Sequence, residues 1–81
     1  MRISVLFFAS ARELAGCSEL ALDVPAGCTA AAALELLLER FPALAPLRSS
    51  LQVAVNQRYA PPDTPLAEGD ELALIPPISG G

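Results

Sequence analysis

The chain has 81 residues, of which 53% are hydrophobic and 17% are charged, and its formal net charge is −4. This length supports one small domain and leaves no room for a deep substrate cleft enclosed on all sides. The five arginines are scattered and form no basic stripe of the kind that nucleic-acid binding requires, so we expect no nucleic-acid ligand.

The composition also argues against a metal centre and against a cysteine nucleophile. Histidine is absent, and the two cysteines, Cys17 and Cys28, form no CxxC pair. We expect both thiols to be structural, because a free cysteine behaves as a small hydrophobic residue. The apolar run near the N-terminus is too short to span a membrane, and Arg12 and Glu13 follow it. A strand is therefore expected there rather than a signal peptide, and a cytoplasmic protein is predicted.

The N-terminal third of the chain predicts two strands joined by a short helical segment. The first strand spans residues 2–8, with hydrophobic side chains on both faces. Residues 9–15 are typical of a short helical turn, which Gly16 ends because glycine readily adopts the left-handed conformation. Residues 19–24 alternate between hydrophobic and polar side chains, and they predict the second strand, which ends at the turn over residues 25–27.

The middle of the chain predicts the main helix. Thr29 caps it, because its hydroxyl can accept a hydrogen bond from a free N–H of the first turn. Helix-favouring alanines follow, and Pro42 ends the helix. The side chains at i, i+3, i+4 and i+7 give it one apolar face, made of Leu34, Leu37, Leu38 and Phe41. Residues 43–50 are expected to be a looser connection.

The C-terminal half predicts a strand over residues 51–56, a short extended stretch over 58–60, and a last strand over 71–75. Both faces of the last strand are apolar, which predicts a central, buried position in the sheet. This order predicts an α+β fold, in which one helix packs on one face of a mixed sheet of four to five strands. It is the order of the ubiquitin-like β-grasp architecture, with residues 1–75 as the domain.

Residues 76–81 are expected to form an extended tail. Pro76 and Pro77 resist helix and cannot donate to a sheet ladder, so they predict a stiff stem that carries the chain out of the domain. Gly80 and Gly81 have no Cβ, so their backbone can enter a narrow site. A terminal carboxylate is ionised and unreactive toward nucleophiles until it is activated, for example as an acyl-adenylate. The tail therefore predicts a carrier that reacts through the Gly81 carboxylate.

Three stretches together resemble the small subunit of molybdopterin synthase, the MoaD family. The first is FFA-x-x-REL-x-G over residues 7–16, and the second is VAVNQ over residues 53–57. The third is GDE…PP-x-SGG over residues 69–81. The likeness covers nearly the whole chain and is weakest over residues 26–50, where only the pattern matches.

The resemblance implies that the chain carries sulfur from an activating enzyme to a second enzyme. A ubiquitin-activating-enzyme-like partner would adenylate Gly81 with ATP, and sulfur transfer would convert Gly81 to a thiocarboxylate. The large subunit would use that sulfur to build the molybdopterin dithiolene from a cyclic pyranopterin precursor, within a heterotetramer. The resemblance implies no bound cofactor. The chain lacks a nucleophile–base pair, so it is not expected to be an enzyme alone, and its partners would supply the catalytic side chains.

The resemblance also implies a docking surface for these partners. Because one helix can cover only one face of the sheet, Leu6 and Phe8 are expected on the uncovered face, opposite Ile3 and Val5. A core position for Leu6 and Ile75 is the alternative. The predicted partner-binding residues are Phe8, Tyr59, Ile75, Pro76, Pro77 and Arg12. For Arg12, the alternative is a solvated surface side chain.

Three other functions remain compatible with the sequence. One is a sulfur carrier of another pathway, such as thiamin synthesis, although those chains are typically shorter and lack the FFA-x-x-REL opening. Another is a ubiquitin-like modifier that is conjugated to lysines of target proteins. The third is an interaction domain with an idle tail, since many chains end in small residues.

Overall fold

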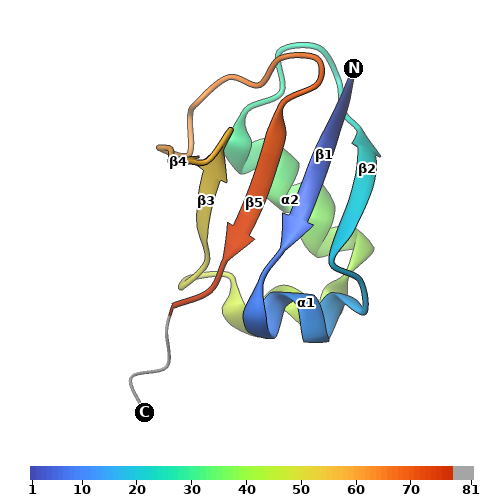
Figure 1. Cartoon of the computed structure of the whole chain (residues 1–81), viewed down its shortest axis with the longest axis vertical. Coiled ribbons are helices and arrows are strands. Elements are labelled where there is room, and N and C mark those ends of the chain that lie inside the picture. Colours follow the sequence, from blue (N-terminus) through green and yellow to red (C-terminus); the bar gives the residue numbers. More distant parts are fainter. Residues whose placement is uncertain (78–81) are drawn as a thin grey trace.

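The computed structural model describes residues 1–77, which form one mixed sheet with a helix across one face (Figure 1). In chain order, the elements of this region are β1 (Arg2–Phe7), α1 (Ala9–Ala15), β2 (Glu19–Asp23), α2 (Ala30–Arg40), the 3-10 helix η1 (Pro42–Leu47), β3 (Gln52–Val55), β4 (Arg58–Tyr59) and β5 (Glu71–Ile75). The strand order is β2-β1-β5-β3-β4. Strands β1 and β5 are parallel, and the other neighbours are antiparallel.

The predicted α+β architecture of the β-grasp type is confirmed. Strand β5 lies in the middle of the sheet, and Leu72, Ala73 and Leu74 are all buried, as its apolar sequence predicts. The looser connection expected after the main helix is largely the 3-10 helix η1, which brings Leu44 fully into the core. Across residues 1–77, no helix has the length and apolar character needed to cross a membrane.

The core lies between α2 and the sheet face that it covers. The sheet contributes Ile3, Val5, Phe7, Leu72 and Leu74, and α2 and η1 contribute Leu37, Leu38 and Leu44. Each of these side chains stabilises the fold by about 1.5–3 kcal/mol relative to an exposed position. Phe41, just after α2, packs edge-to-face on Phe7 with a centroid separation of 5.5 Å. The core therefore uses one face of the sheet only.

Local capping explains where the helices begin and end. The Thr29 hydroxyl accepts a hydrogen bond from the Ala32 N–H at 3.2 Å, which confirms the predicted cap of α2. Gly16 ends α1 with φ at 78°, a conformation that glycine adopts at little cost. Its N–H donates to the Arg12 carbonyl at 2.9 Å. These local signals are the ones that the sequence shows most clearly.

Candidate functional site: an apolar sheet face beside the tail

The sheet face opposite α2 carries a row of apolar side chains that crosses four strands. Strand pairing aligns Leu6 with Ala73, Ala73 with Ala54, and Ala54 with Tyr59. Leu6 alternates along β1 with the core residues Val5 and Phe7, so the row lies on the face that α2 leaves uncovered. We call this surface the open face; it comprises Leu6, Phe8, Ala54, Tyr59, Ala73 and Ile75.

The open face has small residues at its centre and larger ones around them. Ala54 and Ala73 are each only 5% exposed, although no helix covers them. Tyr59 is 68% exposed and Phe8 is 46% exposed, so the predicted exposure of both aromatic side chains is confirmed. Ile75 is half-buried. Exposed aromatic side chains around a flat apolar centre are typical of protein interfaces.

The open face lies directly beside the point where the chain leaves the sheet. Because β1 and β5 are parallel, Phe8, which follows β1, and Ile75, the last residue of β5, lie at the same end of the sheet, next to α1 (Figure 1). The Phe8 N–H donates to the Leu74 carbonyl at 3.3 Å, which fixes Phe8 against β5. Tyr59, Ile75 and Pro77 line one shallow hollow there. A protein that covers the open face would therefore also contact the base of the tail.

The two prolines of the predicted stem differ in their environment. Pro77 is exposed, but Pro76 is buried. Pro76 lines the shallow hollow together with its neighbour Ile75, so the first residue of the predicted stem is not exposed as the second one is. The extended tail over residues 76–81 stays a prediction. Gly80 and Gly81 lie outside the described residues, so their predicted roles remain predictions.

The structure places Arg12 on the surface and both cysteines at least partly in the interior. Arg12 is exposed on α1, and the ion pairs found within residues 1–77 do not involve it. Cys28 is buried, and burial raises the pKa of its thiol, which makes it a poor nucleophile. Cys17 is partly buried and free. In the described part of the chain, no cluster of three or more His, Cys, Asp or Glu side chains could hold a metal ion.

The sequence did not reveal that Ala9 has a left-handed backbone, with φ at 49°. This conformation lets the chain turn from β1 into α1 directly after Phe8. It costs an alanine about 1–2 kcal/mol, and glycine is free of that cost. We expect Ala9→Gly to raise the free energy of unfolding by up to about 1 kcal/mol. Relief of the backbone strain stabilises the folded state, and the greater conformational entropy of glycine in the unfolded chain offsets part of that gain. Urea denaturation measures this.

The matched control for this substitution is Ala15→Gly, in the last turn of the same helix. Ala15 has no positive φ, so glycine there is expected to lower the free energy of unfolding by roughly 0.5–1 kcal/mol. Equal losses for Ala9→Gly and Ala15→Gly would contradict the assignment of strain to Ala9.

A polar network holds the hairpin that carries Tyr59. Asn56 and Gln57 both have positive φ, at 52° and 72°, which gives the tight turn between β3 and β4. The Asn56 side-chain amide donates to Asp70 at 3.0 Å, and the Glu71 N–H donates to the Asn56 side-chain oxygen at 3.0 Å. The turn is therefore tied to the start of β5.

This network predicts a dependence of stability on pH. The Asn56 hydrogen bond, followed by the Ala67 N–H at 2.8 Å, holds the pKa of Asp70 below its usual value. A lowered native pKa stabilises the fold above the unfolded pKa of about 3.9, and this contribution is lost as pH falls through the native pKa. We expect Asp70→Ala to reduce the acid-induced loss of stability, measured as unfolding free energy against pH.

Asn56→Ala is the companion variant, because it removes the largest cause of the shift and leaves the carboxylate in place. It is expected to reduce the same acid dependence, and combining it with Asp70→Ala is expected to add little. Some acid dependence remains in all variants, because Arg2 also lowers the pKa of Asp23. If the two substitutions reduced the acid dependence of stability additively in the double variant, Asn56 would not be the cause of the lowered Asp70 pKa.

Together, the fold and the open face define a class: a small ubiquitin-like β-grasp protein with an exposed apolar face at the end of the sheet where β5 ends. The comparisons with known proteins identify the family. The model of the ThiS family matches residues 5–81, and the chain belongs to this family.

The relatives and solved structures agree with this assignment. The chain is 44% identical to the molybdopterin synthase sulfur carrier subunit of Arabidopsis thaliana, over all of this chain and 84% of the relative. It is 48% identical to the protein of the same name from Drosophila erecta, over all of this chain and 92% of the relative. Among solved structures, SAMP1 from Haloferax volcanii is 32% identical, with a TM-score of 0.90 and full coverage of both chains.

Proposed function

We propose that this chain is the sulfur carrier subunit of a molybdopterin synthase. The observation that carries the proposal is its 44–48% identity, over its full length, to relatives with that name. The apolar open face beside the tail supports it, because a carrier must dock on other proteins while its terminus enters their sites. As a subunit, the chain belongs to a sulfur-transferase complex, and the catalytic side chains come from its partners.

The reacting group in this proposal is the carboxylate of Gly81. A carboxylate oxygen attacks the α-phosphate of ATP, which gives an acyl-adenylate and releases pyrophosphate. Sulfur of a donor then attacks the acyl carbon, so that a C–S bond forms, the C–O bond to AMP breaks and AMP leaves. A hydrosulfide donor gives the thiocarboxylate directly, whereas a persulfide donor gives an acyl disulfide, whose S–S bond a thiol reductant must cleave to leave the thiocarboxylate. Adenylation is required because the ionised carboxylate resists nucleophiles. ATP is bound by the activating enzyme, and this chain carries only the sulfur.

Delivery of the sulfur needs two partners that act in turn. The activating enzyme is the proposed adenylyltransferase, and the large synthase subunit takes the loaded terminus into its active site within a heterotetramer. There the sulfur passes to the cyclic pyranopterin precursor, and two loaded carriers are needed for each dithiolene. We assign Phe8, Tyr59 and Ile75 to these contacts, together with Pro77 and Arg12 at the same end of the sheet. We place these reactions in the cytoplasm, because its reducing conditions keep thiols free, as Cys17 and Cys28 are.

Intact-mass measurement tests this proposal. The chain is incubated with the activating enzyme, ATP and a sulfur donor, and we expect a gain of about 16 Da from the exchange of one oxygen for sulfur. The loaded chain is then expected to convert the pterin precursor to molybdopterin when the large subunit is added. A competent activating enzyme that produces no mass gain would contradict the proposal.

A second candidate function is protein modification. It is favoured by the likeness to SAMP1, a small archaeal modifier protein by its name, at 32% identity and a TM-score of 0.90. Both functions share the acyl-adenylate, and they differ in the nucleophile that follows it. A modifier forms isopeptide bonds with lysines of other proteins. Adducts to lysines, found by mass spectrometry without a gain of sulfur, would favour this candidate.

A further inference from the structure

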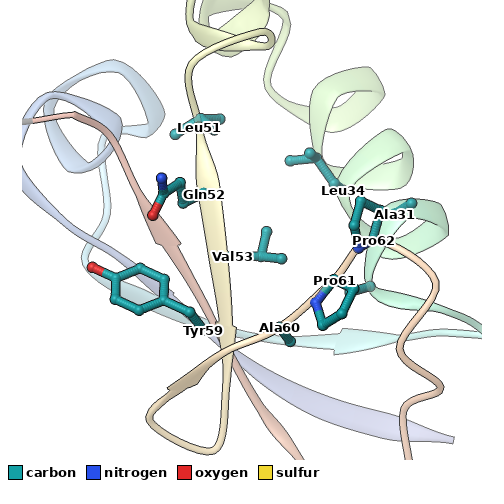
Figure 2. A pocket seen from close by; sticks show the side chains of 10 residues that line it. Ala31, Leu34, Leu51, Gln52, Val53, Tyr59, Ala60, Pro61 and Pro62 are labelled. Carbon is teal, nitrogen blue, oxygen red and sulfur yellow. The ribbon is translucent and has the colours of Figure 1, made fainter.

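The β3–β4 hairpin that carries Tyr59 has little side-chain packing of its own. Strand β4 consists of Arg58 and Tyr59, and both are exposed. Figure 2 shows Tyr59 and Gln52 on one side of β3, and Val53 on the other side, where an apolar hollow separates it from α2. The volume of this hollow is about 490 Å³, and Tyr59 and Ala60 border it. Because a hollow lies where a core would hold β4, packing alone does not fix the position of this short strand.

The turn of the hairpin is also conformationally costly. Asn56 and Gln57 both have positive φ, at 52° and 72°. Asparagine tolerates this conformation, but it is uncommon for glutamine and strains the backbone there. Strained residues of this kind persist only where the surrounding structure holds them, and they gather at functional sites. The turn between β3 and β4 therefore needs an anchor outside the hairpin.

Asn56 provides that anchor through three hydrogen bonds. Its side-chain amide donates to the Asp70 carboxylate at 3.0 Å, and its side-chain oxygen accepts from the Glu71 N–H at 3.0 Å. Its backbone N–H donates to the Glu71 carbonyl at 2.8 Å. All three bonds join the turn to the beginning of β5, the central strand of the sheet. The position of the hairpin is thus set from the middle of the sheet.

Asp70 is itself held on two sides. Its second carboxylate oxygen accepts from the Ala67 N–H at 2.8 Å, and its backbone carbonyl accepts from the Ser4 N–H of β1 at 2.9 Å. The neighbouring side chain of the turn differs, because none of the side-chain hydrogen bonds found within residues 1–77 involves Gln57. The anchor of the hairpin is therefore the pair of Asn56 and Asp70.

We propose that Asn56 and Asp70 are positioning residues for partner binding. They hold the strained hairpin against β5, and they keep Tyr59 on the open face in the orientation that the large synthase subunit contacts. An aromatic side chain that is ordered before docking costs less entropy to bind. The large subunit is the partner only under the proposed function, on which this inference rests. The ordering of Tyr59 in the free chain does not depend on that function.

An exchange of the two side chains tests the proposal. Asn56→Asp keeps the size of the side chain and the acceptor for the Glu71 N–H, but it sets a second carboxylate against Asp70 in place of the donor. We expect it to weaken binding to the large subunit about tenfold, measured by calorimetry. Adding Asp70→Asn puts the donor at position 70 and the acceptor at position 56, so the same hydrogen bonds form at the wild-type net charge. Affinity is then expected to return to within about twofold of the wild type.

Two controls separate this effect from added charge and from lost stability. Gln57→Glu makes the same change from amide to carboxylate in the same turn, outside the anchor. Thr29→Ala removes the cap of α2, on the covered side of the sheet, and so destabilises the fold away from the hairpin. Each control is expected to change the affinity less than about twofold. Urea denaturation checks that every variant is folded under the binding conditions.

Tyr59 itself supplies a spectroscopic readout. It is the only tyrosine of the chain, and tryptophan is absent, so intrinsic fluorescence reports on this side chain. In the free chain, Asn56→Asp is expected to lower the long-lived fluorescence anisotropy of Tyr59 about twofold, because the hairpin moves on the nanosecond timescale once its anchor is lost. The exchange of the two side chains is expected to restore the anisotropy, and Gln57→Glu is expected to leave it unchanged.

A double-mutant cycle tests whether Asn56 acts through Tyr59. In the background of Tyr59→Ala, Asn56→Asp is expected to weaken binding by less than about twofold more, because the side chain that it positions is already gone. Equal weakening in both backgrounds would show that Asn56 contacts the partner directly, and it would overturn the proposal. Unchanged affinity of Asn56→Asp would overturn it too.

Two further results would also overturn the proposal. One is an unchanged Tyr59 anisotropy in Asn56→Asp, and the other is a loss of affinity in Thr29→Ala as large as that in Asn56→Asp. If the wild-type chain takes up sulfur and binds the large subunit, but Asn56→Asp binds equally well, only this inference fails. If the wild-type chain neither loads nor binds, the proposed function fails with it.

Discussion

Removal of Gly81 is expected to abolish sulfur loading and molybdopterin formation completely. The deletion leaves a serine–glycine end, so the new carboxylate is one residue short of the position at which the activating enzyme reacts. A misplacement of about 1 Å can cost 100-fold in rate, and one residue spans about 3.3–3.6 Å. Intact mass after incubation with ATP and a sulfur donor measures the first effect, and molybdopterin formation measures the second.

The matched control for the deletion is Gly80→Ala, which keeps the chain length and adds a single Cβ. We expect slower loading with a normal final mass gain if the terminus enters a narrow site, because the added carbon hinders entry. Both variants are expected to unfold at the wild-type denaturant concentration, since the core lies within residues 3–74. Normal loading after deletion of Gly81 would show that the carrier chemistry does not use this carboxylate.

A charge on the open face is expected to have the second largest effect. Phe8→Asp replaces an aromatic side chain that is 46% exposed, so the substitution leaves the core intact. It is expected to weaken binding to the large subunit about 100-fold, because it buries an unpaired carboxylate and removes an aromatic contact. Calorimetry with the purified large subunit measures the affinity, and the unfolding midpoint checks the fold.

Leu14→Asp is the matched control for Phe8→Asp. Leu14 is another large hydrophobic residue with similar exposure, 41%, but it lies on α1 and not on the open face. The same charge there is expected to change the affinity less than threefold, as for a position outside the interface. Leu14 does not face the same way as Arg12, because residues two positions apart lie on different sides of a helix. If Leu14→Asp weakened binding as much as Phe8→Asp, the partner would cover the side of α1 that carries Leu14, and the assignment to the open face and Arg12 would be wrong.

The elements that local patterns specify were predictable from the sequence. Thr29 and Gly16 act on neighbouring backbone groups, so the start of α2 and the end of α1 follow from a few adjacent residues. The alternation along β1 predicts which of its side chains are buried, and Phe8 is exposed as expected. The family motifs are also short segments of adjacent residues, so the sequence alone shows the resemblance.

Other features were not visible in the sequence because they depend on distant residues. Ala54 and Ala73 are nearly buried at the centre of the open face only because β3 and β5 pair in one register. Pro76 is buried although it follows the last strand, since burial depends on what packs around it. The left-handed Ala9 is set by the join between β1 and α1, for which alanine gives no local signal.

The sequence by itself determined the main strand and helix segments, the α+β class and the chemistry proposed for the Gly81 carboxylate. These depend on side-chain periodicity, caps and residue type, which act over a few positions. Only the tertiary structure decided that Tyr59 lies beside the base of the tail, and that an apolar hollow forms between β3 and α2. The physical reason is that strand order and register bring residues 50–62 against residues 30–34 and 75–77, and no local pattern encodes that meeting.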